Sequence, residues 1–215
     1  GGAKGGSDFD PAGKSNEEIM RFSSSWFYDG KVKAAPITAH RGILDYDTPI
    51  EWVDDVANDD ETVGETFVGE TFGRINKVEA RQVMELLQAY FEKIGKQRIL
   101  DESIDVGIIS PYRAQVQYLR HLIKKETFFK PFRHLLSVNT VDGFQGQERD
   151  VIIVSLVRSN NDGQIGFLRD LRRMNVAMTR ARSKLIIIGD HETLAHHEFY
   201  KKLYEYIKKH KTDNF

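Results

Sequence analysis

The sequence predicts an α/β domain in which helices cover both faces of a parallel β-sheet. Two observations favour this fold class. Short apolar runs of strand length alternate with longer segments of helical periodicity along residues 76–215, the order that produces parallel strands joined by helices. These runs are continuously apolar, which is typical of strands buried on both faces. The 215 residues are 40% hydrophobic and 29% charged, a globular composition, and a chain of this length buries roughly 70% of its unfolded surface.

The predicted elements follow in order along the chain. Residues 16–28 suit a short helix, because Asn16 can cap it and acids occupy its first turn. Residues 49–53 can form a strand. A capping box, Asn76-x-x-Glu79, opens a helix that runs to about residue 95. The remaining segments are a strand at 104–110, a helix at 112–125, strands at 135–140, 151–157 and 185–189, and a closing helix that carries Leu194, Phe199, Leu203 and Ile207.

The predicted organisation is a single domain. Residues 1–15 are glycine-rich and aperiodic, and are interpreted as a linker or an expression-tag remnant. Residues 16–215 form the domain itself. Within it, residues 42–73 contain ten acids and no base, and are predicted to be an acidic, loop-rich insertion. VGETF occurs twice in tandem at 63–72, which suits a surface loop or hairpin, since two copies are too few for a solenoid.

Charge is unevenly distributed along the chain. Residues 1–75 hold 7 Lys/Arg and 15 Asp/Glu, and residues 76–215 hold 24 and 17, so balances of −8 and +7 give the net charge of −1. The basic part permits an anionic partner such as nucleic acid or a nucleotide phosphate. On these numbers alone, a solvated surface with uneven charge is a simpler explanation than an anionic partner.

Composition also excludes several classes of site. The absence of cysteine rules out a disulfide scaffold, a thiolate zinc site and a cysteine nucleophile, and no metal site is predicted. No apolar run approaches the ~20 residues that span a bilayer, and no signal peptide opens the sequence. We therefore expect no membrane partner and a cytoplasmic location, or a nuclear one in a eukaryote.

Four polar clusters are the candidate functional segments. Three follow predicted strands, at residues 110–115, 140–148 and 155–160, and the fourth, at 172–182, precedes the last strand. In an open parallel sheet, ligands bind beyond the carboxyl ends of the strands. Helical spacing in the fourth cluster places Arg173 and Arg180 on one face and seats Met174 and Met178 in the core. The two guanidinium groups are predicted to point at one target, for which phosphate oxygens are well suited; a solvated basic face is the equal alternative.

Taken together, the clusters resemble a known family. TVDGFQGQERDVIIVSLVRSN at 140–160, GFLRDLRRMNVAMTRAR at 166–182 and LIIIGD at 185–190 resemble the second RecA-like motor domain of superfamily 1 helicases. GIISPYRAQ at 107–115 and NEEIMRFSSSWFYDGKV at 16–32 are similar to other segments of the same group. The nearest subgroup is the nonsense-decay, senataxin and Dna-two type of subfamily 1B. The resemblance covers about residues 16–190 and implies a RecA-like fold and the C-terminal motor domain of an ATP-dependent helicase.

The resemblance also implies roles in nucleotide binding. Arg180, the first arginine of TRAR, resembles the arginine finger that reaches the γ-phosphate and neutralises charge on the transferred phosphoryl group. Such fingers are worth ~10³–10⁵ in rate in related NTPases. Gln145, Gly146 and Glu148 resemble the nucleotide-contacting part of their motif, with Glu148 near the ribose and Gln145 coupling the nucleotide to the strand.

A second set of residues is implied to contact nucleic acid. Thr140 and the backbone at Val141 resemble contacts to the phosphates, and Ser110, Pro111 and Tyr112 resemble a second contact to the strand. Hydroxyl groups and backbone N–H groups position a phosphodiester chain without reading its sequence, so single-stranded DNA and RNA are both expected partners. The alternative for Tyr112 is that its ring belongs to the core. For Arg158, a structural role beneath its loop and a contact with a ligand are equal alternatives.

Half of the expected ATP site is missing from the sequence. In such motors ATP lies between two RecA-like domains, and the first carries the phosphate-binding loop and the Mg²⁺ ligands. Here Gly13-Lys14-Ser15 resembles the end of such a loop, but Asp8 stands where its first glycine is required. We therefore expect the N-terminal RecA-like domain of the same protein as a partner and an isolated chain that is inactive. The alternatives are a non-catalytic RecA-like module that binds nucleic acid or protein, and a small NTPase that uses Lys14.

Overall fold

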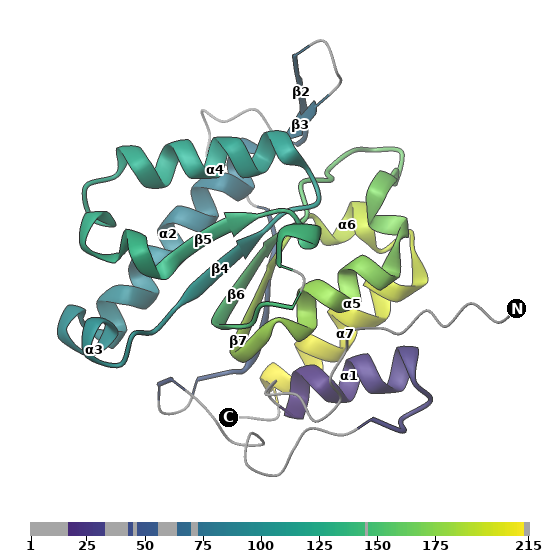
Figure 1. The fold of residues 1–215 in the computed structure, drawn as a ribbon. Helices are drawn as coiled ribbons and strands as arrows, with labels where there is room; N and C mark the ends of the chain where they lie inside the picture. The colour runs from purple at the N-terminus through teal and green to yellow at the C-terminus, as the bar shows by residue number, and fades with distance from the viewer. Residues whose placement is uncertain are drawn as a thin grey trace, which may run out of the picture.

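A five-stranded parallel β-sheet forms the centre of the protein (Figure 1). The computed structural model describes residues 17–32, 43–44, 47–55, 64–69, 73–144 and 146–212. The strand order is β1-β7-β6-β4-β5, and every neighbouring pair is parallel. The strands are β1 (Ile50–Val53), β4 (Val106–Ile109), β5 (Leu136–Asn139), β6 (Arg149–Ser155) and β7 (Ala181–Ile188). The predicted fold class is confirmed.

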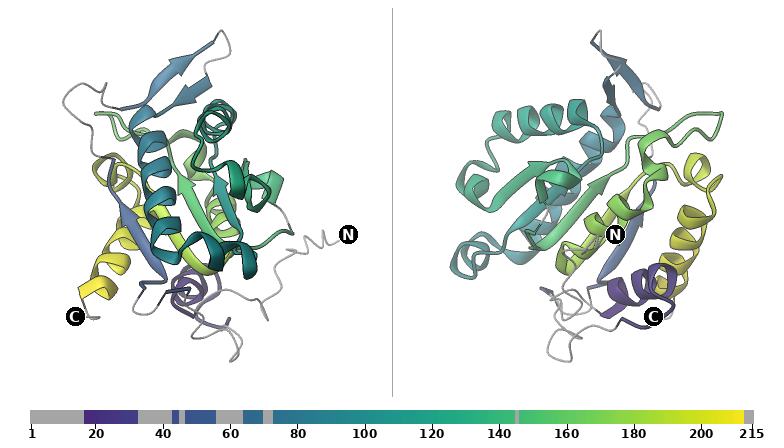
Figure 2. Two further views of the ribbon diagram at one scale, coloured as in Figure 1. Left: turned by 90° about the vertical axis from the view of Figure 1, so that its left-hand side faces the viewer. Right: turned by 45° about the vertical axis from the view of Figure 1, so that its right-hand side comes forward.

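Helices cover both faces of this sheet, as Figures 1 and 2 show. One hydrophobic cluster joins the sheet to α1, α5 and α7, and a second joins it to α2, α3 and α4. Burial on both faces explains why the strand sequences are continuously apolar. The helices are α1 (Glu17–Phe27), α2 (Lys77–Ile94), α3 (Lys96–Asp101), α4 (Arg113–Lys125), α5 (Leu171–Thr179), α6 (His191–Leu194) and α7 (Glu198–Thr212), with 3₁₀ turns η2 (Lys130–Leu135), η3 (Val141–Phe144) and η4 (Gly166–Arg169).

A short antiparallel hairpin stands apart from the sheet. It consists of β2 (Thr66–Val68) and β3 (Gly73–Ile75), and it projects from the body of the protein next to α4 (Figures 1 and 2). β2 contains the end of the first VGETF copy and the first residue of the second, which agrees with the predicted hairpin, while residues 63 and 70–72 of the two copies lie outside the described residues. The acidic segment around it is not all loop, because residues 50–53 pair with β7 as an edge strand of the main sheet.

Most predicted elements are found, with differences at their ends. β7 begins at Ala181 rather than at residue 185. The predicted closing helix is divided into α6 and α7, and α6 begins after Asp190, whose Oδ1 accepts the amides of Glu192 and Thr193. The short helix α3 was not predicted. The proposed cap Asn16 and the first segment, 1–15, lie outside the described residues.

The predicted capping box is only half formed. Asn76 Oδ1 accepts the Glu79 amide at 3.0 Å, which caps α2 as expected. The Glu79 carboxyl group does not return to the Asn76 amide, because Gln115 Oε1 accepts that amide at 3.1 Å. Instead it turns inward and accepts the Ser155 hydroxyl at 2.6 Å and the Val157 amide at 2.8 Å. Glu79 thereby links α2 to the end of β6.

Among the described helices, none combines the length and the apolar composition that a bilayer crossing requires.

Candidate functional site

The predicted site residues lie at opposite edges of the sheet. Residues 110–112 follow β4 and residues 140–141 follow β5, so both lie at the carboxyl edge. Residues 146–148 precede β6, and Arg180 precedes β7, so these lie at the amino edge. The seven residues of β6 separate the two edges by roughly 20 Å at about 3.3 Å per residue. Residues 146–148 belong to a cluster that follows a strand, yet they lie at the amino edge, where the next strand begins.

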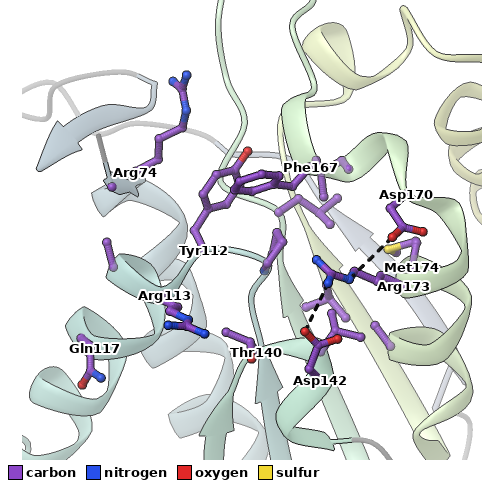
Figure 3. A pocket seen from close by; sticks show the side chains of 18 of the residues that line it. Arg74, Tyr112, Arg113, Gln117, Thr140, Asp142, Phe167, Asp170, Arg173 and Met174 are labelled. Carbon is purple, nitrogen blue, oxygen red and sulfur yellow. Dashed lines mark hydrogen bonds and ion pairs between the residues drawn. The ribbon is translucent and has the colours of Figure 1, made fainter. Parts of the chain in front are cut away.

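A cavity of about 630 Å³ occupies the carboxyl edge (Figure 3). Four of the five predicted nucleic-acid contacts line it, namely Pro111, Tyr112, Thr140 and Val141. In Figure 3 the Arg113 side chain extends toward Thr140, and Arg173 lies between Asp170 and Asp142. The cavity therefore combines backbone groups, a hydroxyl group and cations, which is the chemistry that binds a phosphodiester chain.

Ser110 and Tyr112 are more buried than surface contacts would be. Ser110 is fully buried, and its Oγ accepts the Tyr112 amide at 3.4 Å. Tyr112 is only 6% exposed. Its hydroxyl accepts a long bond of 3.4 Å from Arg158 Nη1, and its ring packs on Phe167 with the centroids 5.4 Å apart. Ser110 thus positions the turn, while Tyr112 is a core aromatic that also forms part of the cavity wall.

The turn after β5 depends on a close contact between two of its own residues. The Thr140 amide donates to Asn139 Oδ1 at 2.9 Å, and the Gly143 amide donates to the Thr140 carbonyl at 3.0 Å. A Cβ atom on Gly143 would lie 2.2 Å from Asn139 Cγ, so any larger residue would displace the Asn139 side chain that accepts the Thr140 amide. The sequence Asn-Thr-Val-Asp-Gly thereby fixes Thr140 at the cavity.

The amino edge brings the predicted nucleotide-binding residues together. The Arg149 amide donates to the Arg180 carbonyl at 2.9 Å, which places the start of β6 beside that of β7. Gly146 is exposed and has φ +71°, a conformation that favours glycine. Glu148 is half-buried next to it. Gln145 lies outside the described residues.

Arg180 is a buried cation at this edge. It is 8% exposed, and its Nε donates to the Val176 carbonyl at 3.2 Å. Burial lowers the pKa of the Arg180 guanidinium, and the negative charge of Glu148 partly offsets that effect. Arg180 forms no ion pair with any residue that the structure describes. A guanidinium that is desolvated and not neutralised is well suited to an anionic ligand.

Two neighbouring arginines have structural roles instead. Arg182, the second arginine of TRAR, contacts Asp105 at 2.7 Å and Asp150 at 3.1 Å, and so links β7 to β6 and to the start of β4. Arg149 approaches Asp105 at 3.8 Å. Burial raises the pKa of Asp150, and Arg182 opposes that shift. These ion pairs hold the strands in register at the edge where Arg180 lies.

The basic helix α5 does not direct its arginines at one target. Met174 and Met178 are buried as predicted. Arg173, however, lies near the start of α5 and pairs with Asp142 and Asp170 at the carboxyl edge. Arg180 follows the end of α5, at the amino edge. The helix runs from one edge of the sheet to the other, so two residues on the same helical face can lie at opposite edges. Helical spacing alone predicts the shared face but not the edge at which each residue lies.

Sequence reasoning did not identify the residue that holds the cavity together. Glu65 accepts Arg158 Nε and Arg74 Nη1, each at 2.5 Å, and the Ser159 amide at 3.1 Å. Arg158 is 4% exposed, which supports the structural role considered for it. Glu65 and Arg158 are 93 residues apart, and no local pattern marks the pair. In the described part of the chain, no three His, Asp or Glu side chains are placed to hold a metal ion.

Comparison with known proteins identifies the family. The sequence model of a family described as AAA domain matches residues 14–192. The DNA polymerase alpha-associated DNA helicase A of Saccharomyces cerevisiae is 38% identical over 195 residues, 83% of this chain and 27% of that protein. The regulator of nonsense transcripts 1 homolog of Neurospora crassa is 33% identical over 198 residues, 88% of this chain and 17% of that protein. Helicase SEN1 of Saccharomyces cerevisiae is 34% identical over 196 residues, 88% of this chain and 8% of that protein.

The chain spans about a quarter or less of the length of these relatives. The shared segment includes the residues of both edges described above, since the family match ends at residue 192. The match over most of its length shows that the chain belongs to the AAA domain family, as a RecA-like domain of the superfamily 1B helicase type.

Proposed function

We propose that this chain is the C-terminal motor domain of an ATP-dependent superfamily 1 helicase. In this proposal, the amino edge completes an ATP site and the carboxyl edge holds the backbone of single-stranded DNA or RNA. The observation that carries the proposal is the state of Arg180, a buried arginine without an ion-pair partner among the described residues. Its neighbours Arg149 and Arg182 are both engaged by acids.

The amino edge has the groups that the second half of an ATP site needs. Arg180 provides a fixed positive charge in a poorly solvated position, where it would stabilise negative charge that develops on the transferred phosphoryl group. Gly146 allows close approach of a nucleotide to the backbone, and Glu148 can accept a ribose hydroxyl. Bound Mg²⁺ would neutralise phosphate charge, and its ligands belong in this proposal to the N-terminal RecA-like domain of the same protein.

The carboxyl edge provides the hold on the strand. Thr140 and Val141 line the same cavity as Tyr112, and the Arg113 side chain extends toward Thr140 (Figure 3). One connection of nine residues, 140–148, begins at this cavity and ends at Glu148 on the other edge. A shift of this connection when ATP binds would therefore change the hold on the strand, which is how closure of the cleft between two domains can be coupled to movement along nucleic acid.

The test is ATP turnover in the protein that contains both motor domains, with and without single-stranded DNA or RNA. Arg180→Ala should lower turnover by roughly 10³-fold or more while strand binding is retained. Arg98→Ala is the matched control, because Arg98 is an exposed arginine on α3, outside both candidate edges, and its Nε contacts Glu102 at 2.8 Å. Normal turnover by Arg180→Ala would disprove the assignment of Arg180.

The same assay on the chain alone separates the alternatives. No turnover, with strand binding intact, fits a motor half that needs its partner domain. Turnover that Lys14→Ala abolishes would instead identify a small self-contained NTPase. Failure of the two-domain protein to turn over ATP under any condition would favour a non-catalytic module.

A further inference from the structure

Three large apolar side chains are exposed among the described residues, namely Phe67 (59% exposed), Val68 (36%) and Phe167 (64%). Two of them line one cavity. Val68 and Phe167 line the carboxyl-edge cavity, and Phe67 precedes Val68 in β2. Single exposed apolar residues need no explanation, but a group from two distant segments at one cavity indicates a binding surface.

The exposure of Phe167 is built into the turn that carries it. Its neighbours in the chain, Ile165 and Leu168, are 2% and 4% exposed and anchor η4 in the core. Gly166 has φ +52°, and a Cβ atom there would lie 2.2 Å from Arg158 Nη1. The backbone at 166 is therefore pressed onto the buried guanidinium, and Phe167 is directed outward.

The Phe167 ring is also fixed in orientation. It packs on the Tyr112 ring with the centroids 5.4 Å apart and the planes inclined by 37°, as Figure 3 shows. Arg158 donates to the Tyr112 hydroxyl from below and is itself held by Glu65. Glu65 also binds Arg74, so one carboxylate fixes both the hairpin and the aromatic pair. A ring that is already held in place loses little conformational freedom when a ligand packs on it.

The positive charge of Arg113 at the same cavity indicates the class of ligand. Arg113 is exposed, extends toward Thr140 (Figure 3) and forms no ion pair with the described residues. The lining of the cavity thus brings a cationic group and a hydroxyl group together with an outward aromatic ring. Single-stranded nucleic acid has the matching arrangement, because phosphates and flat apolar bases alternate along it.

We propose that Phe167, supported by Tyr112, is a stacking platform for an unpaired base of the strand, while Arg113 contacts an adjacent phosphate. The β2–β3 hairpin, with Val68 at the cavity, forms the other boundary of the base position. Every base has a flat face, so the platform discriminates unpaired from paired bases and does not read their sequence. This inference rests on the proposed function, because it assigns a base contact to the same nucleic-acid interface.

The test compares three variants of the full chain on two labelled oligonucleotides of equal length, one intact and one with abasic sites. Phe167→Ala should weaken binding of the intact single strand by roughly tenfold and leave binding of the abasic strand unchanged. Phe167→Trp should restore the loss. Arg113→Ala should weaken both strands equally and reduce the slope of log affinity against log salt by about one. Thermal unfolding of each variant shows whether the fold is retained. We expect it to be retained, because the side chains of Phe167 and Arg113 are exposed.

The outcomes separate this inference from the proposed function. Equal losses on the two oligonucleotides, or no loss, for a folded Phe167→Ala would overturn the platform while strand binding stands. If the unaltered chain binds neither oligonucleotide, both the proposed strand interface and the platform are wrong. Phe167 would then belong to a surface that another protein or domain covers.

Discussion

The ring of Phe144 lies directly on the backbone of Gly107. A Cβ atom on Gly107 would be 2.8 Å from Phe144 Cε1 and 2.7 Å from Ile152 Cδ1, which is closer than real side chains approach. Gly107 belongs to β4, which lies next to the central strand β6, and Phe144 ends η3 in the connection between the two candidate edges. Because Gly107 has no side chain, the connection can cross the sheet with Phe144 in contact with the β4 backbone. Phe144 is 1% exposed.

The first prediction follows from this contact. Gly107→Ala should lower the free energy of unfolding by about 1–3 kcal/mol, because the added methyl group overpacks a filled core. Urea unfolding of the purified chain measures the change. Phe144→Leu should recover part of the loss when combined with Gly107→Ala, although alone it removes packing. Additive losses in the double variant would show that the two residues are not in contact.

The second prediction concerns a buried lysine that anchors the edge strand. Lys184 in β7 is 2% exposed, and its Nζ contacts Asp47 at 2.6 Å and Glu51 at 2.9 Å. Lys184→Met should cost about 3–5 kcal/mol, because it leaves two carboxylates without their cation. Lys201→Met, at an exposed position of α7, is the control and should cost less than about 0.5 kcal/mol. A similar small loss for both variants in urea unfolding would contradict this role of Lys184.

The third prediction is a pH dependence of stability. Burial is the main cause that raises the pKa of Asp55 from 3.8 to about 6, and Asp190 and Asp54 add to the shift. Between these values the folded state binds a proton that the unfolded state has lost, so the contribution of Asp55 to stability is lost as the pH rises from about 4 to about 6. At about 1.4 kcal/mol per pKa unit the loss has an upper bound of about 3 kcal/mol, and solvent screening of this partly exposed carboxyl group reduces it.

Asp55→Asn isolates this effect from the other acids. The variant should show a flatter dependence of the unfolding free energy on pH between 4 and 6, since the amide does not titrate. Its Oδ1 can still accept from Asn76 Nδ2, which donates to Asp55 at 2.9 Å. An unchanged pH dependence in Asp55→Asn would mean that Asp55 titrates normally in the folded state.

How far the sequence predicts this protein depends on the range of each interaction. Apolar runs and helical periodicity are local, and they predicted every strand of the main sheet. The position of Arg180 at the amino edge could not be predicted in this way, because it depends on which end of α5 faces which edge. The pairing of Glu65 with Arg158 spans 93 residues and brings an acid of the hairpin under a loop that follows β6. Phe167 belongs to the segment 166–182 that resembles the helicase family, but its exposure depends on how the turn packs and cannot be predicted from the residue types of that segment.

The last prediction concerns Glu79 of α2, whose buried carboxyl group contacts the residues at the end of β6. Val157 has φ +71°, which is strained for a β-branched residue. Glu79 Oε2 accepts the Val157 amide at 2.8 Å, and Asn76 Nδ2 donates to the Val157 carbonyl at 3.3 Å. The strained residue is thus held at both of its backbone groups. Complete burial raises the pKa of Glu79 well above its ordinary value, and hydrogen bonds from Ser155 and Val157 only partly oppose this shift.

A neutral amide should therefore replace this carboxyl group with little loss. Glu79→Gln keeps an oxygen that can accept from Ser155 and Val157, so it should change the free energy of unfolding by less than about 1 kcal/mol near pH 7. Glu79→Ala leaves the two donors without an acceptor and opens a cavity, and should cost about 2–4 kcal/mol. Because the raised pKa makes the unaltered chain lose stability as the pH rises above the ordinary value for Glu, Glu79→Gln should gain relative to it from pH 5 to pH 8. If the difference in unfolding free energy between the two proteins instead stays constant over that range, the carboxylate is already ionised in the folded protein and holds Val157 as an anion.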